Sequence, residues 1–511
     1  MGSGLKKAGR QSMVSIGGSL LSAVISFLLV FIATNELGKE QAGVLLLAVA
    51  LFNIVARIAL MGTATGLVRY VSQARATSTG GDIPDLLRWA LLPVAVLGTL
   101  IAGLLLLFAP QLASLLANDA DPAQLEQSLR VAAPFLPAAA LMFALLGATR
   151  GFSKVRPTVL IDRIGRPVLQ LLAVLVALAV GANAVGWTIA WLAPYVIAMI
   201  GGGIALAKLR RGPSLTGHDH HLTRQSFWKF TRPQWGVDFL RVMVRWQDTL
   251  LIGILLGPGE AAIYSAVTRL VKLASMVNQS LVETVTPQIS EALASNDMPK
   301  AERLYQASTA WLVVGVFPVY LTSALYSGPL SAIFGEEFRA GATALVILSV
   351  GRLLGTATGP VEAVLTMSGR SATNLGNQIG SLVANIVLTI VLVPLIGLPG
   401  AALAWVASIL VNNYAPYFQV RKATGLHPFG AATLRATAAV VTAFAIPAAI
   451  IHAVTDPGLV LSLAGATFSG LLVLAWAWHN RELLAIDQLL KRGKRNGNKT
   501  GKLEPQSPQP N

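Results

Sequence analysis

Cysteine is absent from the 511 residues of the chain, and charged residues are scarce, at 12%. Without cysteine the chain has no disulfide, no thiolate nucleophile and no thiolate ligand for a metal. Soluble domains carry about 25% charged residues, so the low charge content excludes an ordinary soluble enzyme. A nucleotide-binding loop of the GxxxxGK(S/T) type is also missing, and we expect no ATP-driven chemistry, no cofactor and no metal site in this chain.

Hydrophobic residues make up 54% of the chain, and the mean hydropathy is +0.64. They recur in runs of about 20 residues, the length at which a helix crosses about 30 Å of hydrocarbon. We therefore predict an all-α polytopic membrane protein with about 14 transmembrane helices. The predicted spans lie near residues 14–34, 43–65, 88–109, 130–149, 167–183, 186–207, 234–256, 260–287, 308–330, 341–366, 374–396, 399–419, 431–452 and 457–478.

Bases outnumber acids, and the formal net charge is +16. Such a balance can indicate a nucleic-acid partner, but these bases lie mostly in short segments between apolar runs, where the positive-inside rule explains them. One side of the predicted membrane collects almost all of them, whereas the other holds only Lys39, Arg130 and Arg339. We expect no nucleic acid, and a bacterial inner-membrane protein with both termini in the cytoplasm.

Short motifs repeat along the chain at offsets of 219, 215 and 214 residues. Leu37-Gly38 matches Leu256-Gly257, Ile164-Gly165 matches Ile379-Gly380, and Ala190-Trp191 matches Ala404-Trp405. Their common order and nearly constant offset predict two six-helix lobes related by a pseudo-two-fold axis along the membrane normal. Two further C-terminal helices are then an appendage to these lobes.

The expected division of the chain follows from this repeat. Residues 1–208 form an N-terminal lobe, 209–232 a cytoplasmic linker, 233–420 a C-terminal lobe, 421–480 spans thirteen and fourteen, and 481–511 a basic disordered cytoplasmic tail. The linker contains His218, His220 and His221. We interpret them as part of an exposed polar segment rather than as a metal site.

The seventh predicted span carries four charged residues: Asp238, Arg241, Arg245 and Asp248. Their spacing places them on one face of a helix. A charge at the centre of a bilayer costs at least about 2.5–3.5 kcal/mol, so this face must meet protein or a water-filled cavity. Two interpretations stay open: a lined transport pathway, or an ion-pair ladder that joins neighbouring helices.

Four stretches resemble the polysaccharide-export flippases of the multidrug/oligosaccharidyl-lipid/polysaccharide superfamily. They are LLVFIATNELGKEQAGVLLLAVALFNIVARIALMGTATGLVRYVS, RWQDTLLIGILLGPGEAAIYSAVTRL, VTPQISEAL and AIFGEEFRAGATALVIL. The resemblance implies transport of an undecaprenyl-diphosphate-linked oligosaccharide across the cytoplasmic membrane. It also implies a V-shaped cavity between two lobes with alternating access.

A lipid-linked diphosphate sugar needs a cationic, hydrated cavity that opens sideways to the bilayer. Guanidinium groups bind phosphate oxygens in a bidentate manner, so arginines are the first candidates. The cationic candidates are Arg57, Arg241, Arg245, Arg269, Lys272 and Arg352; the acids for charge balance or ion coupling are Asp238, Asp248, Glu283 and Glu362; and the sugar contacts are Asn377, Gln378, Asn385 and Asn412. Alternatively, the bases snorkel to an interface, Asp248 pairs with Arg245, and the amides join helices.

The leading hypothesis is a flippase for lipid-linked oligosaccharide, with a polysaccharide polymerase or glycosyltransferases as further partners. A lipid II flippase and a cation-coupled multidrug exporter of the same superfamily are the alternatives within transport. The exporter is disfavoured because Met13 to Thr34 contains no charge. A membrane glycosyltransferase or polymerase is the competing class, and the short exported loops disfavour it. We therefore expect a transporter and not an enzyme.

Overall fold

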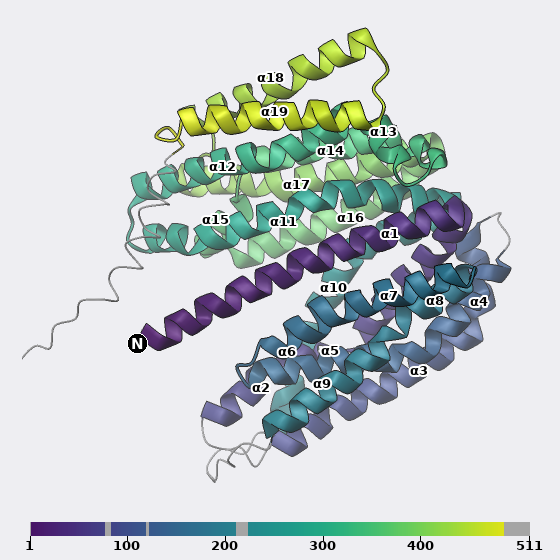
Figure 1. Cartoon of the computed structure of the whole chain (residues 1–511). Helices are drawn as coiled ribbons and strands as arrows, with labels where there is room; N and C mark the ends of the chain where they lie inside the picture. Colours follow the sequence, from purple (N-terminus) through teal and green to yellow (C-terminus); the bar gives the residue numbers. More distant parts are fainter. Residues whose placement is uncertain (1, 77–82, 119–121, 211–222, 485–511) are drawn as a thin grey trace, which may run out of the picture.

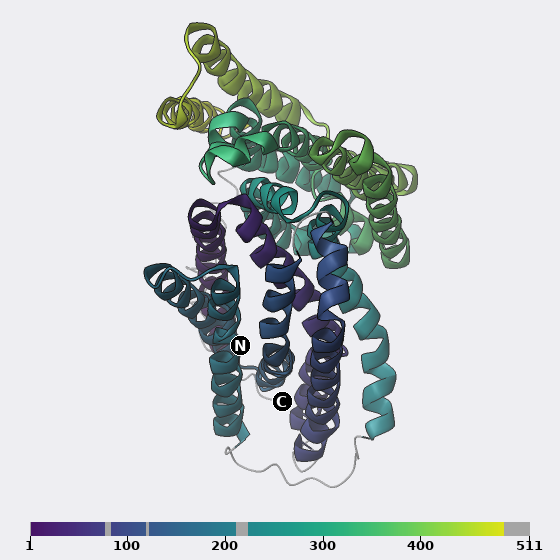
Figure 2. The same ribbon diagram turned by 90° about the vertical axis from the view of Figure 1, so that its right-hand side faces the viewer.

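The computed structural model describes residues 2–76, 83–118, 122–210 and 223–484, with side chains from Gly17 onward except for a few in one helix. Every regular element in these ranges is a helix. Figures 1 and 2 show two groups of helices, one coloured purple to blue and the other green. The first group contains α1 (Gly2–Ala59), α2 (Thr63–Ala76), α3 (Ile83–Ala117), α4 (Ala123–Ala132), η2 (Ala133–Phe135), α5 (Leu136–Gly151), α6 (Arg156–Thr158), η3 (Val159–Gly165), α7 (Arg166–Ala179), α8 (Ala184–Leu192) and α9 (Pro194–Arg210).

The second group follows the long helix α10 (Arg224–Leu256). Its helices are α11 (Pro258–Ala294), α12 (Met298–Leu325), α13 (Ser327–Ala332), η4 (Glu336–Gly341), α14 (Ala342–Ala357), α15 (Val361–Met367), α16 (Ser371–Ile396) and α17 (Leu398–Thr424). The last two helices, α18 (Ala431–Val454) and α19 (Leu459–His479), lie at the outer edge of this group in both views.

The helices bear out the prediction of an all-α membrane protein. In the described part of the chain, 9 helices are long and apolar enough to cross a membrane. The first of these, Gly17–Ala59, contains most of the first predicted span and residues 43–59 of the second, which continues across a break into α2. The four predicted spans outside the nine helices lie on α10, α11, α17 and, for residues 167–179, on α7. The predicted spans at 308–330 and 341–366 run across short breaks, from α12 into α13 and from α14 into α15.

Glycine makes the same backbone corner at two positions of the repeat. Gly38 interrupts α1 with φ 70° and ψ 174°, and Gly257 separates α10 from α11 with φ 88° and ψ 178°. An L-residue with a side chain rarely adopts a φ of this sign, which explains why glycine occupies both positions. The Leu37-Gly38 and Leu256-Gly257 motifs therefore share one conformation as well as one sequence.

The two corners pack directly against each other. A Cβ atom built on Gly43 would lie 1.9 Å from the carbonyl oxygen of Pro258, so the backbones of α1 and α11 are in contact here. A Cβ atom on Gly259 would lie 2.5 Å from Oε1 of Glu40. The two groups of helices are thus joined at the end of the molecule that contains both corners.

Helix α10 packs against both groups. Thr223 caps its first turn by accepting a hydrogen bond from the Ser226 amide at 3.2 Å, and Tyr70 of α2 donates to the Ser226 carbonyl at 2.8 Å. Residues 224–232, which we expected in a linker, are the first turns of this helix. The histidines of the predicted linker lie outside the described residues. Farther along, Gln247 donates to Asn385 of α16, in the second group.

Candidate functional site

Arg245 lies at the centre of a cluster of basic side chains between the two groups. Its guanidinium interacts electrostatically with Arg57 of α1 and with Arg269 and Lys272 of α11. The Arg245 side chain is exposed. Among the described residues, Arg57, Arg245 and Arg269 form no ion pair. Within the described part of the chain, these three guanidinium groups therefore carry positive charge without a directly contacting carboxylate.

Lys272 has exposed surface although protein atoms surround it densely. These two properties occur together in a side chain that borders a water-accessible space enclosed by protein. Arg269 is half-buried and donates from Nη1 to Oγ of Ser26 at 3.0 Å, which links α11 to α1. The two α11 bases therefore belong to the region between the groups.

Arg57 stacks on an aromatic ring. Its Cζ atom lies 3.8 Å from the centroid of Phe143 of α5, a cation–π geometry. Asp162 and Asp238 attract this guanidinium electrostatically without pairing with it. The stacking fixes the orientation of the Arg57 plane and leaves its N–H groups available for a ligand.

The four charged residues predicted on one face of α10 behave differently from one another. Arg241 pairs with Asp238 at 3.4 Å, and the Arg241 side chain is 73% exposed. The expected pair between Asp248 and Arg245 does not form among the described contacts. Asp248 instead accepts a hydrogen bond from Gln247 at 3.3 Å and attracts Lys272. Among the described contacts, Arg241 is thus ion-paired and Arg245, four residues further along α10, is not.

Arg352 and Glu362 form a second polar cluster in the C-terminal group. The Arg352 Cζ atom lies 4.3 Å from the Trp405 ring centroid, and its Nε atom is buried without a hydrogen-bond partner among the described residues. Glu362 attracts Arg352 and accepts a hydrogen bond from Asn412. The side chain of the fourth predicted acid, Glu283, lies outside the described residues.

The chain breaks its helix just before Glu362, as the Gly359-Pro360 dipeptide suggests. Helix α14 ends at Ala357 and α15 begins at Val361, with Gly359 at φ 64°. The break frees backbone carbonyls. The Tyr305 hydroxyl donates a hydrogen bond to one of them, the backbone carbonyl of Thr358, at 2.7 Å. A protein group thus satisfies the carbonyl that a buried helix break would otherwise leave unpaired.

Three of the four proposed sugar contacts are hydrogen-bonded to other helices. Asn377 of α16 and Gln419 of α17 exchange two hydrogen bonds, at 2.7 and 3.0 Å. Asn385 is 2% exposed and accepts from Gln247, and Asn412 donates to Glu362. Gln378 is exposed and is the amide that we retain as a candidate for the sugar. The other three contacts fit the alternative in which polar side chains join helices.

Replacing Asn377 with alanine is expected to cost stability rather than transport. Loss of the paired amide hydrogen bonds should lower the free energy of unfolding by about 1–2 kcal/mol. Gln419→Ala should cost a similar amount, and the double variant little more than either, because each single change already breaks both bonds. Denaturation of the purified variants measures this coupling. Lost transport at unchanged stability would instead make Asn377 a substrate contact.

Sequence reasoning missed a polar network around the start of the fifth span. The segment from Arg156 to Ala179, part of which we expected to be a loop, is helical and includes the π-helical η3. Asp162 of η3 accepts from Nε of Arg166 at 3.0 Å, and both side chains are partly buried. The pattern Asp162, Arg166, Gln170 at intervals of four residues was the available signal, since such residues share a helix face.

The helices and their apolar composition define a multi-pass membrane protein, in which a cluster of basic side chains comes from α1, α10 and α11. A family model described as "Polysaccharide biosynthesis protein" matches residues 8–293, more than half of the chain. The chain therefore belongs to this family, and the predicted membership of the multidrug/oligosaccharidyl-lipid/polysaccharide (MOP) superfamily is confirmed.

Two curated relatives come from Haloferax volcanii. The chain is 28% identical over 177 residues to the probable low-salt glycan biosynthesis flippase Agl15, covering 33% of this chain and 36% of that protein. It is 25% identical over 285 residues to the probable flippase AglR, covering 52% of this chain and 57% of that one. The matches thus span about a third and just over half of the length of these relatives.

Solved structures share the fold over most of the chain. A lipid II flippase, MurJ, in an inward closed conformation aligns with a TM-score of 0.70 at 13% identity, covering 93% of this chain and 99% of that one. An inward-facing multidrug resistance transporter of the MATE family in the MOP superfamily aligns with a TM-score of 0.66 at 14% identity, covering 80% and 94%. At these identities the alignments establish the fold and not the substrate.

Proposed function

We propose that the protein is a flippase that moves a polyprenyl-diphosphate-linked oligosaccharide from the cytoplasmic to the outer leaflet. The observation that carries the proposal is a set of three arginines from α1, α10 and α11 that form no ion pair with any residue whose side chain the structure describes: Arg57, Arg245 and Arg269. Unneutralised charges at membrane depth are costly unless water or a ligand compensates them. A diphosphate is a ligand of the right charge, and guanidinium groups match its oxygens.

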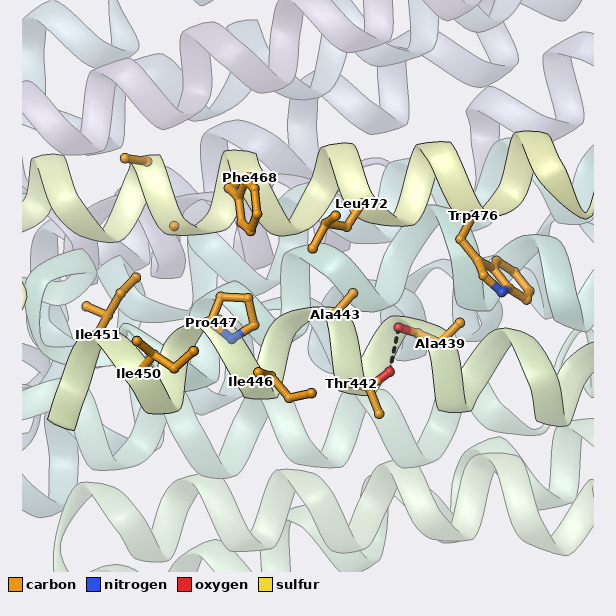
Figure 3. A pocket seen from close by; sticks show the side chains of 12 residues that line it. Ala439, Thr442, Ala443, Ile446, Pro447, Ile450, Ile451, Phe468, Leu472 and Trp476 are labelled. Atoms are coloured by element: carbon orange, nitrogen blue, oxygen red, sulfur yellow. Dashed lines mark hydrogen bonds between the residues drawn. The ribbon is translucent and has the colours of Figure 1, made fainter.

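The substrate also has a long apolar tail, and the C-terminal helices contain a pocket of matching chemistry. This pocket, of about 700 Å³, lies between α18 and α19 and is lined by side chains such as Ile446, Phe468 and Trp476 (Figure 3). The Thr442 hydroxyl in its wall donates to the backbone carbonyls of Ala438 and Ala439. With that hydroxyl satisfied, the lining suits part of a polyprenyl chain.

Alternating access requires that the two groups of helices separate at one end at a time. At the end that contains the Gly38 corner, Asn35 of α1 donates to the Ile333 carbonyl at 2.9 Å. The Lys39 amide donates to the Glu337 carboxylate at 3.4 Å. We assign this end to the outer face, with both termini in the cytoplasm, because few bases lie there. The structure then corresponds to a state that is closed to the outside.

A transport assay with a panel of substrates tests the proposal. Purified protein in liposomes should expose the sugar of a short-chain polyprenyl-diphosphate oligosaccharide to a membrane-impermeant glycosidase, well above protein-free liposomes. The same assay with lipid II and with a cationic dye separates the other two transport functions, since lipid II also carries a diphosphate and the dye does not. Movement of the dye alone would replace the proposal with an exporter. A partner polymerase or glycosyltransferase remains part of the proposal and is tested by co-purification.

A further inference from the structure

The helix that carries Asp162 departs from α-helical geometry where it packs against α1. Val159–Gly165 forms a π-helix, and such segments are frequent at functional sites because they change the register of the side chains. A Cβ atom on Gly18 of α1 would lie 2.7 Å from Val159, so the two helices approach closely. Arg163 donates to Ser19 of α1 at 2.7 Å. Contacts with α1 by residues before and after Asp162 in the sequence, Val159 and Arg163, therefore fix its position relative to α1.

One carboxylate faces three guanidinium groups here. Asp162 pairs with Arg166 through Oδ1 at 3.0 Å, and it also attracts Arg57 and Arg150 electrostatically. Asp238 attracts Arg57 and Arg150 as well, but it belongs to α10 and is paired with Arg241. Within the first group of helices, Asp162 is thus an acid that partly compensates Arg57, one of the bases of the proposed headgroup site.

Arg166 holds the carboxylate in place through a network of its own. Its Nη1 atom donates to Oε1 of Gln170 at 3.1 Å and to the Tyr195 hydroxyl at 3.5 Å. Gln170 is 3% exposed and donates to the Trp191 carbonyl at 2.7 Å. Gln170 therefore ties Arg166 to the Trp191 backbone, and Arg166 in turn holds Asp162. As a result, Asp162 has little freedom to swing toward Arg57 and form a full ion pair.

We propose that Asp162 is the internal counter-anion of the cavity and weakens the binding of an anionic headgroup enough for its release. This inference rests on the proposed function and adds a residue that sets affinity. Three arginines without a counter-charge would bind a diphosphate too tightly to release it. Transport requires both binding and release. A carboxylate held near Arg57, but not paired with it, lowers the positive potential without blocking the guanidinium.

The variant Asp162→Asn tests this role, because it keeps the shape and the acceptor for Arg166 and removes only the charge. The probe is a short-chain polyprenyl diphosphate, measured by calorimetry on the full-length protein in nanodiscs. We expect its Kd to fall by about tenfold, the effect of one like charge at roughly 10 Å in a medium of effective dielectric constant about 20. The translocation rate should fall, because release becomes slower. Binding of the uncharged polyprenol should not change.

A second variant is expected to change the Kd in the opposite direction. Arg166→Gln removes the cation that competes for Asp162, so the carboxylate acts more strongly on Arg57, and the Kd of the diphosphate probe should rise. Asp85→Asn is the matched control, because Asp85 is an exposed acid paired with Arg88 at 3.7 Å on α3. If the wild type does not bind the probe, the proposed function is wrong. If the wild type binds it and both variants match the control, Asp162 has only a structural role and the inference is overturned.

Discussion

Replacing Arg245 with glutamine should reduce transport of the lipid-linked sugar by at least tenfold and leave the protein folded. The side chain is exposed and interacts electrostatically with bases of both groups, Arg57 of α1 and Arg269 of α11. Losing a charge-assisted hydrogen bond to phosphate costs about 1.5–3 kcal/mol, which corresponds to a factor of about 10 to 150. Stability should not change, since the guanidinium forms no ion pair with any residue that the structure describes. Reconstituted transport and thermal unfolding measure the two effects separately.

The matched control for this change lies one turn away on the same helix. Arg241 is equally charged and 73% exposed, but it pairs with Asp238 at 3.4 Å. Arg241→Gln should therefore have a much smaller effect on transport than Arg245→Gln. Equal loss of transport in both variants would mean that the whole charged face of α10 acts as a structural unit. In that case the diphosphate site would have to lie elsewhere.

The fold could be predicted from the sequence to the level of its helices, because the length of apolar runs is set directly by the membrane. Breaks within spans were harder to place. The Gly-Pro dipeptide at 359–360 lies at one such break, whereas the π-helix η3, which packs closely against α1, contains no proline of its own. The sequence of residues 156–166 therefore predicts a basic loop, whereas the structure shows that they are helical.

The candidate site could be predicted in part for a similar reason. A charged residue within an apolar run signals a polar interior, which made Arg57, Arg245 and Lys272 candidates. Amide side chains carry no comparable signal, since they serve equally as helix contacts, and pairs such as Asn377 with Gln419 depend on which helices become neighbours. Asp162 was missed because its partners come from α1, α5 and α7 and are distant in the sequence from one another.

Gly43→Ala should strongly disfavour the state that the structure shows. The added Cβ would lie 1.9 Å from the Pro258 carbonyl oxygen and 2.3 Å from its carbon, and both are backbone atoms that cannot move aside as a side chain does. Overpacking of this kind costs about 1–3 kcal/mol. Because α1 and α11 belong to different groups of helices, the strain is relieved when the groups separate at the Gly38 end. The variant should therefore shift toward an outward-open state.

The absence of cysteine makes this shift measurable with a single label. Asn35→Cys places a thiol beside the Ile333 carbonyl, at the junction of the two groups. Its reaction with a membrane-impermeant maleimide should be faster when Gly43 is alanine. Gly103→Ala is the control, since a Cβ there meets nothing within 4 Å, and alanine at an exposed helical glycine gains about 0.8–1 kcal/mol. Lower thermal stability with unchanged labelling would show that the contact between α1 and α11 persists through the transport cycle and that the groups separate elsewhere.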